Sequence, residues 1–234
     1  MATKLLLIDL DDTLWATHVN NKKSLEQLYT ALNWGQYFVS FEDFFSTYYR
    51  INVELWERYN QGYITKQELA LDRLRLPLSP YLSLTQDQWR EIDEQFLSFV
   101  KQQTLLCPNA LDTMAYLKSR YDICILSNGF GEVQYTKIEK TGLSPYIDEV
   151  VLSEDVGINK PAAEIFHIAL ERMGATPGES LMIGDSFSSD IAGASNAGIG
   201  SIWYNAYDFP MPQSEGVKPP LHIINDLAEL KVLL

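Results

Sequence analysis

The 234-residue chain carries 31 acidic and 18 basic side chains, a formal net charge of −13, which opposes the electrostatic attraction that drives nucleic-acid binding. Its content of 46% hydrophobic and 21% charged residues is typical of a globular protein and argues against disorder. No apolar run approaches the roughly 20 residues of a membrane span, and no secretory signal pattern opens the sequence. We therefore expect a cytoplasmic protein that binds neither a nucleic-acid polymer nor a membrane.

The first predicted element is an apolar strand at residues 4–8, which leads directly into Asp9 and Asp11. A strand at the centre of a parallel sheet ends in the crevice where ligands of open α/β folds bind. Asp9 there suits a nucleophile that attacks phosphorus, and Asp11 suits the acid and base that serves the leaving oxygen and a water. Asp12 is expected to be a surface turn residue.

The second predicted segment, from about residue 22 to 103, has helical periodicity without a convincing strand. We predict that residues 17–103 form an all-helical cap domain inserted after the first strand, which acts as a lid over the cleft. Its expected helices are 24–34 and 41–59, then two that open at capping boxes starting at Thr65 and Thr85 and are separated by Pro77 and Pro80.

From Pro108 onward helices and strands alternate, which predicts an α/β fold with a doubly wound, mostly parallel sheet. The core domain then consists of residues 1–16 and 104–234. Cys107 and Cys124, the two cysteines, are expected to be reduced and buried. The expected helices are 109–119, 131–141, 161–173 and 188–197, and the strands are 122–127, 148–152, 180–185, 200–204 and 222–225, before a final helix.

Two more predicted strand ends carry groups that suit phosphate. Ser127, Asn128 and Gly129 follow a strand, where a hydroxyl and backbone N–H groups can hold phosphate oxygens. By themselves these residues are more typical of a turn or a helix cap. Lys160 precedes Pro161 at a predicted helix start, where it would add positive charge, although a loop Lys is usually only solvated.

The strand at 180–185 also ends on a carboxylate, Asp185, and Asp190 follows five residues later. A hard cation such as Mg²⁺ prefers oxygen ligands, so Asp185 is a candidate metal ligand. Asp190 is expected either to support the metal site from a distance or to hold Lys160. Without those partners, Asp190 at a helix start would be ordinary dipole-favourable charge.

These motifs, taken in order, resemble those of the haloacid dehalogenase superfamily of hydrolases. The resemblance rests on the segment Asp9–Thr13, on Ser127-Asn-Gly, on Lys160-Pro and on the segment Gly184–Asp190. It implies a Rossmann-like core with a helical cap of the first type, and a phosphatase that depends on Mg²⁺ and forms an aspartyl-phosphate.

The same resemblance implies roles for individual residues. Asp9 is the nucleophile, Asp11 is the acid and base, and Ser127 and Lys160 bind the phosphate. Mg²⁺ is held by the side chains of Asp9 and Asp185 and by the backbone carbonyl of Asp11. Thr13 and Asp190 are expected to support these residues without touching the substrate.

Further segments resemble the subgroup of house-cleaning pyrimidine 5′-nucleotidases, which implies a pyrimidine nucleoside monophosphate as substrate. Trp56 or Tyr49 of the cap would then stack on a base, or else pack in the helix core. The segments are Leu55-Trp56, Asn60–Gly62, Ile64-Thr65, Ser127–Phe130, Thr141–Leu143, Ser153–Gly157 and Trp203–Ala206.

Other functions stay open at this point. The substrate can instead be a sugar phosphate or another small metabolite. A phosphomutase would share the two Asp residues, whereas dehalogenases of this superfamily resemble the chain without an acid at Asp11. A non-catalytic binding protein is disfavoured, because a degenerate site usually loses at least one of its charged residues.

Overall fold

The computed structural model describes residues 3–234, which form two compact units. Among the described residues, one unit consists of 3–17 and Thr104–Leu234, and the other of His18–Gln103. The domain boundaries expected from the sequence lie within one residue of these limits. That the second unit acts as a lid stays a prediction.

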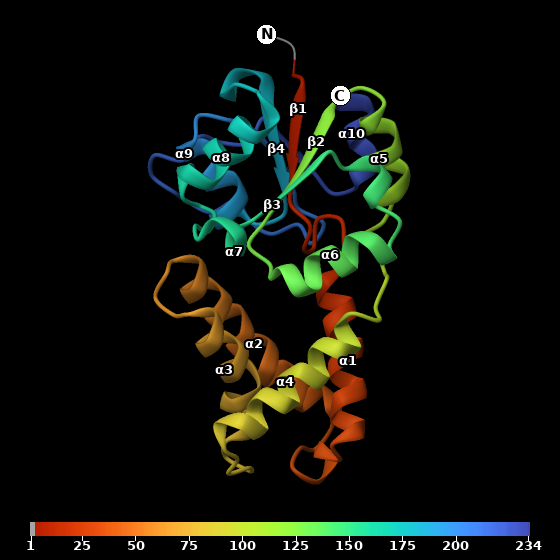
Figure 1. The fold of residues 1–234 in the computed structure, drawn as a ribbon, viewed down its shortest axis with the longest axis vertical. Coiled ribbons are helices and arrows are strands. Elements are labelled where there is room, and N and C mark those ends of the chain that lie inside the picture. The colour runs from red at the N-terminus through yellow and green to blue at the C-terminus, as the bar shows by residue number, and fades with distance from the viewer. Residues whose placement is uncertain (1–2) are drawn as a thin grey trace. The chain divides into compact units, whose positions relative to one another are not determined.

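The first unit is built on a six-stranded sheet in which every neighbouring pair is parallel. The strand order is β3-β2-β1-β4-β5-β6, so β1 lies inside the sheet, between β2 and β4 (Figure 1). This confirms the expected doubly wound parallel fold. The strands are β1 (Leu5–Ile8), β2 (Asp122–Ser127), β3 (Glu149–Leu152), β4 (Ser180–Gly184), β5 (Gly200–Tyr204) and β6 (His222–Ile224).

Helices cover both faces of this sheet, as a parallel sheet requires. In Figure 1, α8 and α9 lie on one side of β1, and α5 and α10 lie on the other. Alternate strand residues such as Leu5 and Leu7 pack with Phe166 of α8 in one buried core. The helices are α5 (Ala110–Lys118), α6 (Gly131–Lys140), α7 (Ser153–Val156), α8 (Ala163–Met173), α9 (Ala192–Asn196) and α10 (Leu230–Leu233).

The second unit is helical, and its helices are fixed by caps and by one buried ion pair. Both expected capping boxes form, at Thr65 and at Thr85. Arg73 of α3 and Asp93 of α4 are buried, and Arg73 Nη2 lies 2.6 Å from Asp93 Oδ1. This ion pair links the two helices. Its helices are α1 (Thr17–Ala31), which begins at the end of the first unit, then α2 (Phe41–Asn60), α3 (Lys66–Leu78) and α4 (Gln86–Val100).

Tyr49 and Trp56, the aromatic side chains expected either to stack on a base or to pack in the helix core, are both partly exposed. Tyr49 packs edge-on against His18, with ring centroids 4.8 Å apart. Tyr49 also stacks on Phe45, and Trp56 packs edge-on against Tyr59. Packing within the helical unit and contact with a base both stay predictions for these two residues.

Several element boundaries differ from those expected. The first helix begins at Thr17 rather than at residue 24, because its first turns are polar and lack the apolar periodicity used to find helices. Pro77 lies within the last turn of α3 rather than beyond the helix, so α3 ends one residue after a position that lacks a backbone donor. Pro161 does not start α8, which begins two residues later, at Ala163.

The helix expected at 188–197 is divided into a π-helical turn, Phe187–Ile191, and the short α9. A π-helical turn is wider than an α-helical one and often occurs at a functional site. Asp190 lies in this turn and is fully buried.

Both cysteines, Cys107 and Cys124, are free and buried, as expected. Within residues 3–234 no helix combines the length and the apolar character needed to cross a membrane.

Candidate active site

The sheet topology brings the predicted carboxylates together at the carboxyl ends of β1 and β4. The chain leaves β1 toward β2 and β3 and later returns to the other side of β1 as β4, so the order reverses between β1 and β4. Ligands of open α/β sheets bind at such a switch point. Asp9 follows β1 directly and donates its backbone N–H to Ile183 O of β4, at 2.9 Å. Asp185 follows the end of β4.

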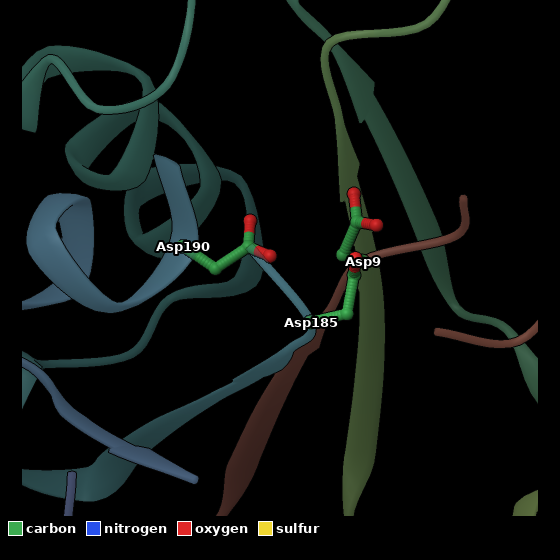
Figure 2. Close-up of side chains that lie close together, drawn as sticks. All are labelled: Asp9, Asp185 and Asp190. Carbon is green, nitrogen blue, oxygen red and sulfur yellow. The ribbon is translucent and has the colours of Figure 1, made fainter. Parts of the chain in front are cut away.

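Figure 2 shows the side chains of Asp9 and Asp185 beside each other, with Asp190 directed toward them from its own turn. One carboxylate oxygen of each residue lies within 4.8 Å of the others. Three negative groups this close repel one another in a buried setting, so the site needs positive charge.

Lys160 supplies one positive charge and is itself almost completely buried. Its ammonium group donates to Asp9 Oδ1 at 2.6 Å, to Asp190 Oδ1 at 2.7 Å and to the carbonyl of Leu126 at 2.7 Å. All three donors of the group are therefore used. Burial acts to lower the pKa of Lys160, but the carboxylates of Asp190 and Asp9 outweigh it and raise that pKa.

The backbone of Lys160 is fixed by Asn128. The Asn128 side chain accepts the Lys160 N–H at 2.8 Å and donates to the Lys160 carbonyl at 2.9 Å, as a neighbouring peptide group would. Both residues are buried. The side chain of Asn128 is thus engaged with Lys160, and its expected contact with substrate stays a prediction.

The oxygens of Asp9 differ in their surroundings. Oδ1 accepts from Lys160, whereas among residues 3–234 Oδ2 has only a weak contact, 3.5 Å, with the hydroxyl of Thr13. Burial raises the pKa of Asp9 to about 7; Lys160 opposes this shift, and Asp190 and Asp11 add to it. Oδ2 is therefore the oxygen that Asp9 can offer to phosphorus or to a cation.

Thr13 connects the two strand ends. Its hydroxyl donates to Asp185 Oδ1 at 3.1 Å and accepts the Asp185 N–H at 3.0 Å. Burial, with the charges of Asp9, Asp190 and Asp12, raises the pKa of Asp185 well above its ordinary value. A buried pair of carboxylates with these shifts is a donor set that a hard divalent cation would stabilise in its ionised form.

Asp190 lies close to the pair, and both of its carboxylate oxygens accept hydrogen bonds. Its Oδ1 accepts from Lys160 and its Oδ2 accepts the Ser186 N–H at 3.0 Å. Of the two expected roles of Asp190, this geometry fits the one in which it holds Lys160.

The loop after β1 carries Asp11 on a tight turn. Asp12 has a φ of 56° and donates its backbone N–H to the carbonyl of Trp15 at 2.8 Å. An Asp tolerates this left-handed conformation, which closes the turn and leaves Asp11 beside Trp15.

Sequence reasoning did not identify two residues that bind Asp11, namely Lys137 and Gln134 of α6. Lys137 Nζ lies 2.5 Å from Asp11 Oδ1, and Gln134 Nε2 lies 2.6 Å from Asp11 Oδ2. Burial acts to raise the pKa of Asp11, but Lys137, Thr17 and Gln134 together lower it. The signal in the sequence was two polar residues three apart on an otherwise apolar helix face.

Comparisons with known proteins agree with this arrangement. A family model described as haloacid dehalogenase-like hydrolase matches residues 3–198. The chain is 33% identical to the pyrimidine 5′-nucleotidase YjjG of Escherichia coli K12, over 98% of this chain and 96% of that protein. It is 32% identical to the pyrimidine 5′-nucleotidase PynA of Streptococcus pneumoniae, over 88% of this chain and 86% of that protein. Relatives named as phosphatases of sugar phosphates also match.

Among solved structures, the magnesium-bound putative hydrolase YfnB of Bacillus subtilis superposes with a TM-score of 0.88 at 27% identity. The match covers 100% of this chain and 99% of that one.

Proposed function

We propose, from the premise that the chain belongs to the family of haloacid dehalogenase-like hydrolases, that it hydrolyses phosphate monoesters through an aspartyl-phosphate on Asp9. The observation that carries the proposal is the asymmetric environment of Asp9. Lys160 binds one oxygen at 2.6 Å, and the other oxygen has no strong hydrogen-bond partner in the part of the chain that the structure describes. Such a carboxylate is held in one orientation, its negative charge is partly neutralised by Lys160, and its second oxygen is able to attack phosphorus.

In the first half-reaction, Asp9 Oδ2 forms a bond to phosphorus as the bond to the leaving oxygen breaks. Asp11, whose pKa is lowered despite its burial by Lys137, Thr17 and Gln134, must hold a proton at this stage. It gives that proton to the leaving oxygen, so an alcohol departs. In the second half-reaction, Asp11 takes a proton from a water whose oxygen attacks phosphorus, and the bond to Asp9 breaks. Phosphate is released, and Asp11 has given one proton and taken one.

Positive charge is required throughout, because a carboxylate attacks a phosphate dianion in a strongly acidic protein. Lys160 supplies part of that charge, and the Ser127 hydroxyl adds a hydrogen-bond donor. A Mg²⁺ ion held by Asp9 and Asp185 would supply the remaining charge stabilisation. The expected contribution of the Asp11 carbonyl to that metal site stays a prediction.

We further propose a pyrimidine nucleoside monophosphate as the substrate, since the relative that matches nearly the whole chain at 33% identity is a pyrimidine 5′-nucleotidase. A sugar phosphate is the second candidate, because relatives named for such substrates also match. Selection of the substrate by the helical unit, residues His18–Gln103, is part of this proposal.

The experiment measures phosphate released from UMP, dUMP, dTMP and a set of sugar phosphates, with Mg²⁺ and with EDTA. We expect turnover with Mg²⁺, a preference for the nucleotides, and a loss of at least about 10³-fold in Asp9→Asn. Turnover retained by Asp9→Asn would refute covalent attack by this residue. A preference for sugar phosphates would overturn the substrate assignment and leave the phosphatase assignment intact.

A further inference from the structure

We propose that Lys137 and Gln134 of α6 are positioning residues, which together hold the Asp11 carboxylate for proton transfer and tie it to Ser127 of the phosphate-binding loop. The proposal rests on the proposed function, since it assigns how the proton carrier of that reaction is oriented. It concerns two side chains that the mechanism above does not use.

The hydrogen bonds around Asp11 leave its carboxylate a single orientation. Oδ1 accepts from Lys137 at 2.5 Å and from the Thr17 hydroxyl at 2.7 Å, and Oδ2 accepts from Gln134 at 2.6 Å. These donors approach from two different elements. A carboxylate that accepts hydrogen bonds at both oxygens cannot rotate about its Cβ–Cγ bond without losing charge-assisted hydrogen bonds.

Lys137 is held in place by its own surroundings. Its side chain is only 7% exposed, whereas that of Asp11 is 29% exposed. The ammonium group also lies 4.1 Å from the centre of the Trp15 ring, within the range of a cation–π contact. Lys137 therefore binds Asp11 from the protein side and leaves an exposed side of the carboxylate for the reacting oxygen.

The side-chain amide of Gln134 binds both Asp11 and Ser127. Its Nε2 donates one hydrogen to Asp11 and the other to Ser127 Oγ, at 2.7 Å. The Gly129 N–H also donates to Ser127 Oγ, at 3.1 Å. Both acceptor sites of the Ser127 hydroxyl are thus filled, so its proton is left to be donated to a phosphate oxygen.

The absence of a side chain at Gly129 leaves room for the Gln134 amide. A Cβ on Gly129 would lie 2.2 Å from Gln134 Nε2. Gln134 itself is 1% exposed, so the amide cannot move aside into solvent. Gly129 therefore contributes space for Gln134, in addition to the phosphate contact expected of its backbone.

The test uses Lys137→Met, because among the described residues Lys137 contacts the active site only through Asp11 and the Trp15 ring. The readout is kcat/KM for two leaving groups. The alkoxide of UMP needs a proton from Asp11, whereas the nitrophenolate of p-nitrophenyl phosphate departs without one. We expect a loss of about 10- to 100-fold with UMP and less than about threefold with p-nitrophenyl phosphate.

The control is Lys140→Met, which removes the same charge from an exposed position of the same helix and is expected to change neither value by more than about twofold. Lys137→Arg, which keeps the charge, is expected to recover much of the activity. Gln134→Met is expected to lower kcat/KM for both substrates, because it also releases Ser127.

A double-mutant cycle separates positioning from folding. When Asp11→Asn is already present, adding Lys137→Met is expected to lower kcat/KM for UMP by less than about a further threefold. Equal losses in both backgrounds, or equal losses for both leaving groups, would overturn the proposal. A wild-type protein without turnover on any phosphate ester would instead overturn the proposed function, which distinguishes the two failures.

Discussion

Lys160 and Asp190 have different roles near the strand ends: Lys160 binds the Asp9 carboxylate, and Asp190 holds Lys160. Lys160 uses all three of its donors on Asp9, Asp190 and the Leu126 carbonyl. Asp190 accepts from Lys160 with one oxygen and from a backbone N–H with the other. Asp190 therefore fixes Lys160, and Lys160 in turn fixes one oxygen of Asp9.

Gly184 provides the space that Asp190 needs, which leads to a prediction. A Cβ at this position would lie 2.2 Å from Asp190 Oδ2 and 2.4 Å from its carboxyl carbon. Because Lys160 and Ser186 hold that carboxylate, it cannot move aside cheaply. We expect Gly184→Ala to lower the free energy of unfolding by about 1–3 kcal/mol and to reduce turnover by displacing Lys160.

Chemical denaturation and phosphate release on the purified variant check this prediction. Gly35→Ala is the matched control, because its Cβ would meet no atom closer than 3.6 Å. A Gly184→Ala protein as stable and as active as the wild type would show that Asp190 is not held in this position.

Three of the chemistry-bearing residues could be predicted because each lies at or directly after the end of an apolar strand. Asp9, Ser127 and Asp185 come at or just after the ends of β1, β2 and β4, and parallel strands bring such ends together. Gln134 and Lys137 could not be predicted in the same way. Their partners are 123 and 126 residues away in the chain, and no spacing rule links a helix face to a turn that far away.

At the scale of elements, strands and caps follow local rules, whereas helix boundaries near the site do not. The capping boxes at Thr65 and Thr85 formed where the pattern indicated them. The turn Phe187–Ile191 is π-helical, and Asp190 within it makes a buried hydrogen bond with Lys160. Tertiary contacts outweigh helix propensity there.

Asp148 connects three elements and allows a pH-dependent prediction. Its carboxylate accepts the Ile123 N–H of β2 at 2.8 Å and pairs with Lys118 of α5. Partial burial acts to raise the pKa of Asp148, but these partners outweigh it and lower the pKa from its ordinary value of 3.8. A depressed pKa in the folded state stabilises the protein above the ordinary value, and this stabilisation is lost as the pH falls through the folded value.

We therefore expect Asp148→Asn to destabilise the protein at pH 7 by about 0.5–1 kcal/mol, allowing for solvent screening of this partly exposed pair. The difference from the wild type should disappear in strong acid. Urea unfolding at a series of pH values measures both effects. Asp122→Asn, an exposed position at the start of the same strand, is the control. A constant difference at every pH would contradict the role of the Asp148 charge.

At the scale of the whole molecule, the excess of negative charge favours binding of a cation. The net charge is −13, and Asp9, Asp185 and Asp190 are brought within 4.8 Å of one another with Lys160 as their cationic partner. Folding must therefore bring like charges together at the switch point of the sheet. A ligand that binds only the folded protein and offsets this repulsion stabilises the fold by mass action.

We expect Mg²⁺ to raise the melting temperature of the wild-type protein, with a stabilisation of about 2.7 kcal/mol at a concentration 100 times its Kd. In Asp185→Asn the melting temperature without Mg²⁺ should rise, because a neutral amide no longer repels Asp9. The additional increase in melting temperature with Mg²⁺ should then be small, since one of the two carboxylate ligands is lost. Thermal unfolding with Mg²⁺, and with NaCl at equal ionic strength, separates site binding from general screening. An equal Mg²⁺ response in both proteins would show that the cation binds away from the pair, because only Asp185 differs between them.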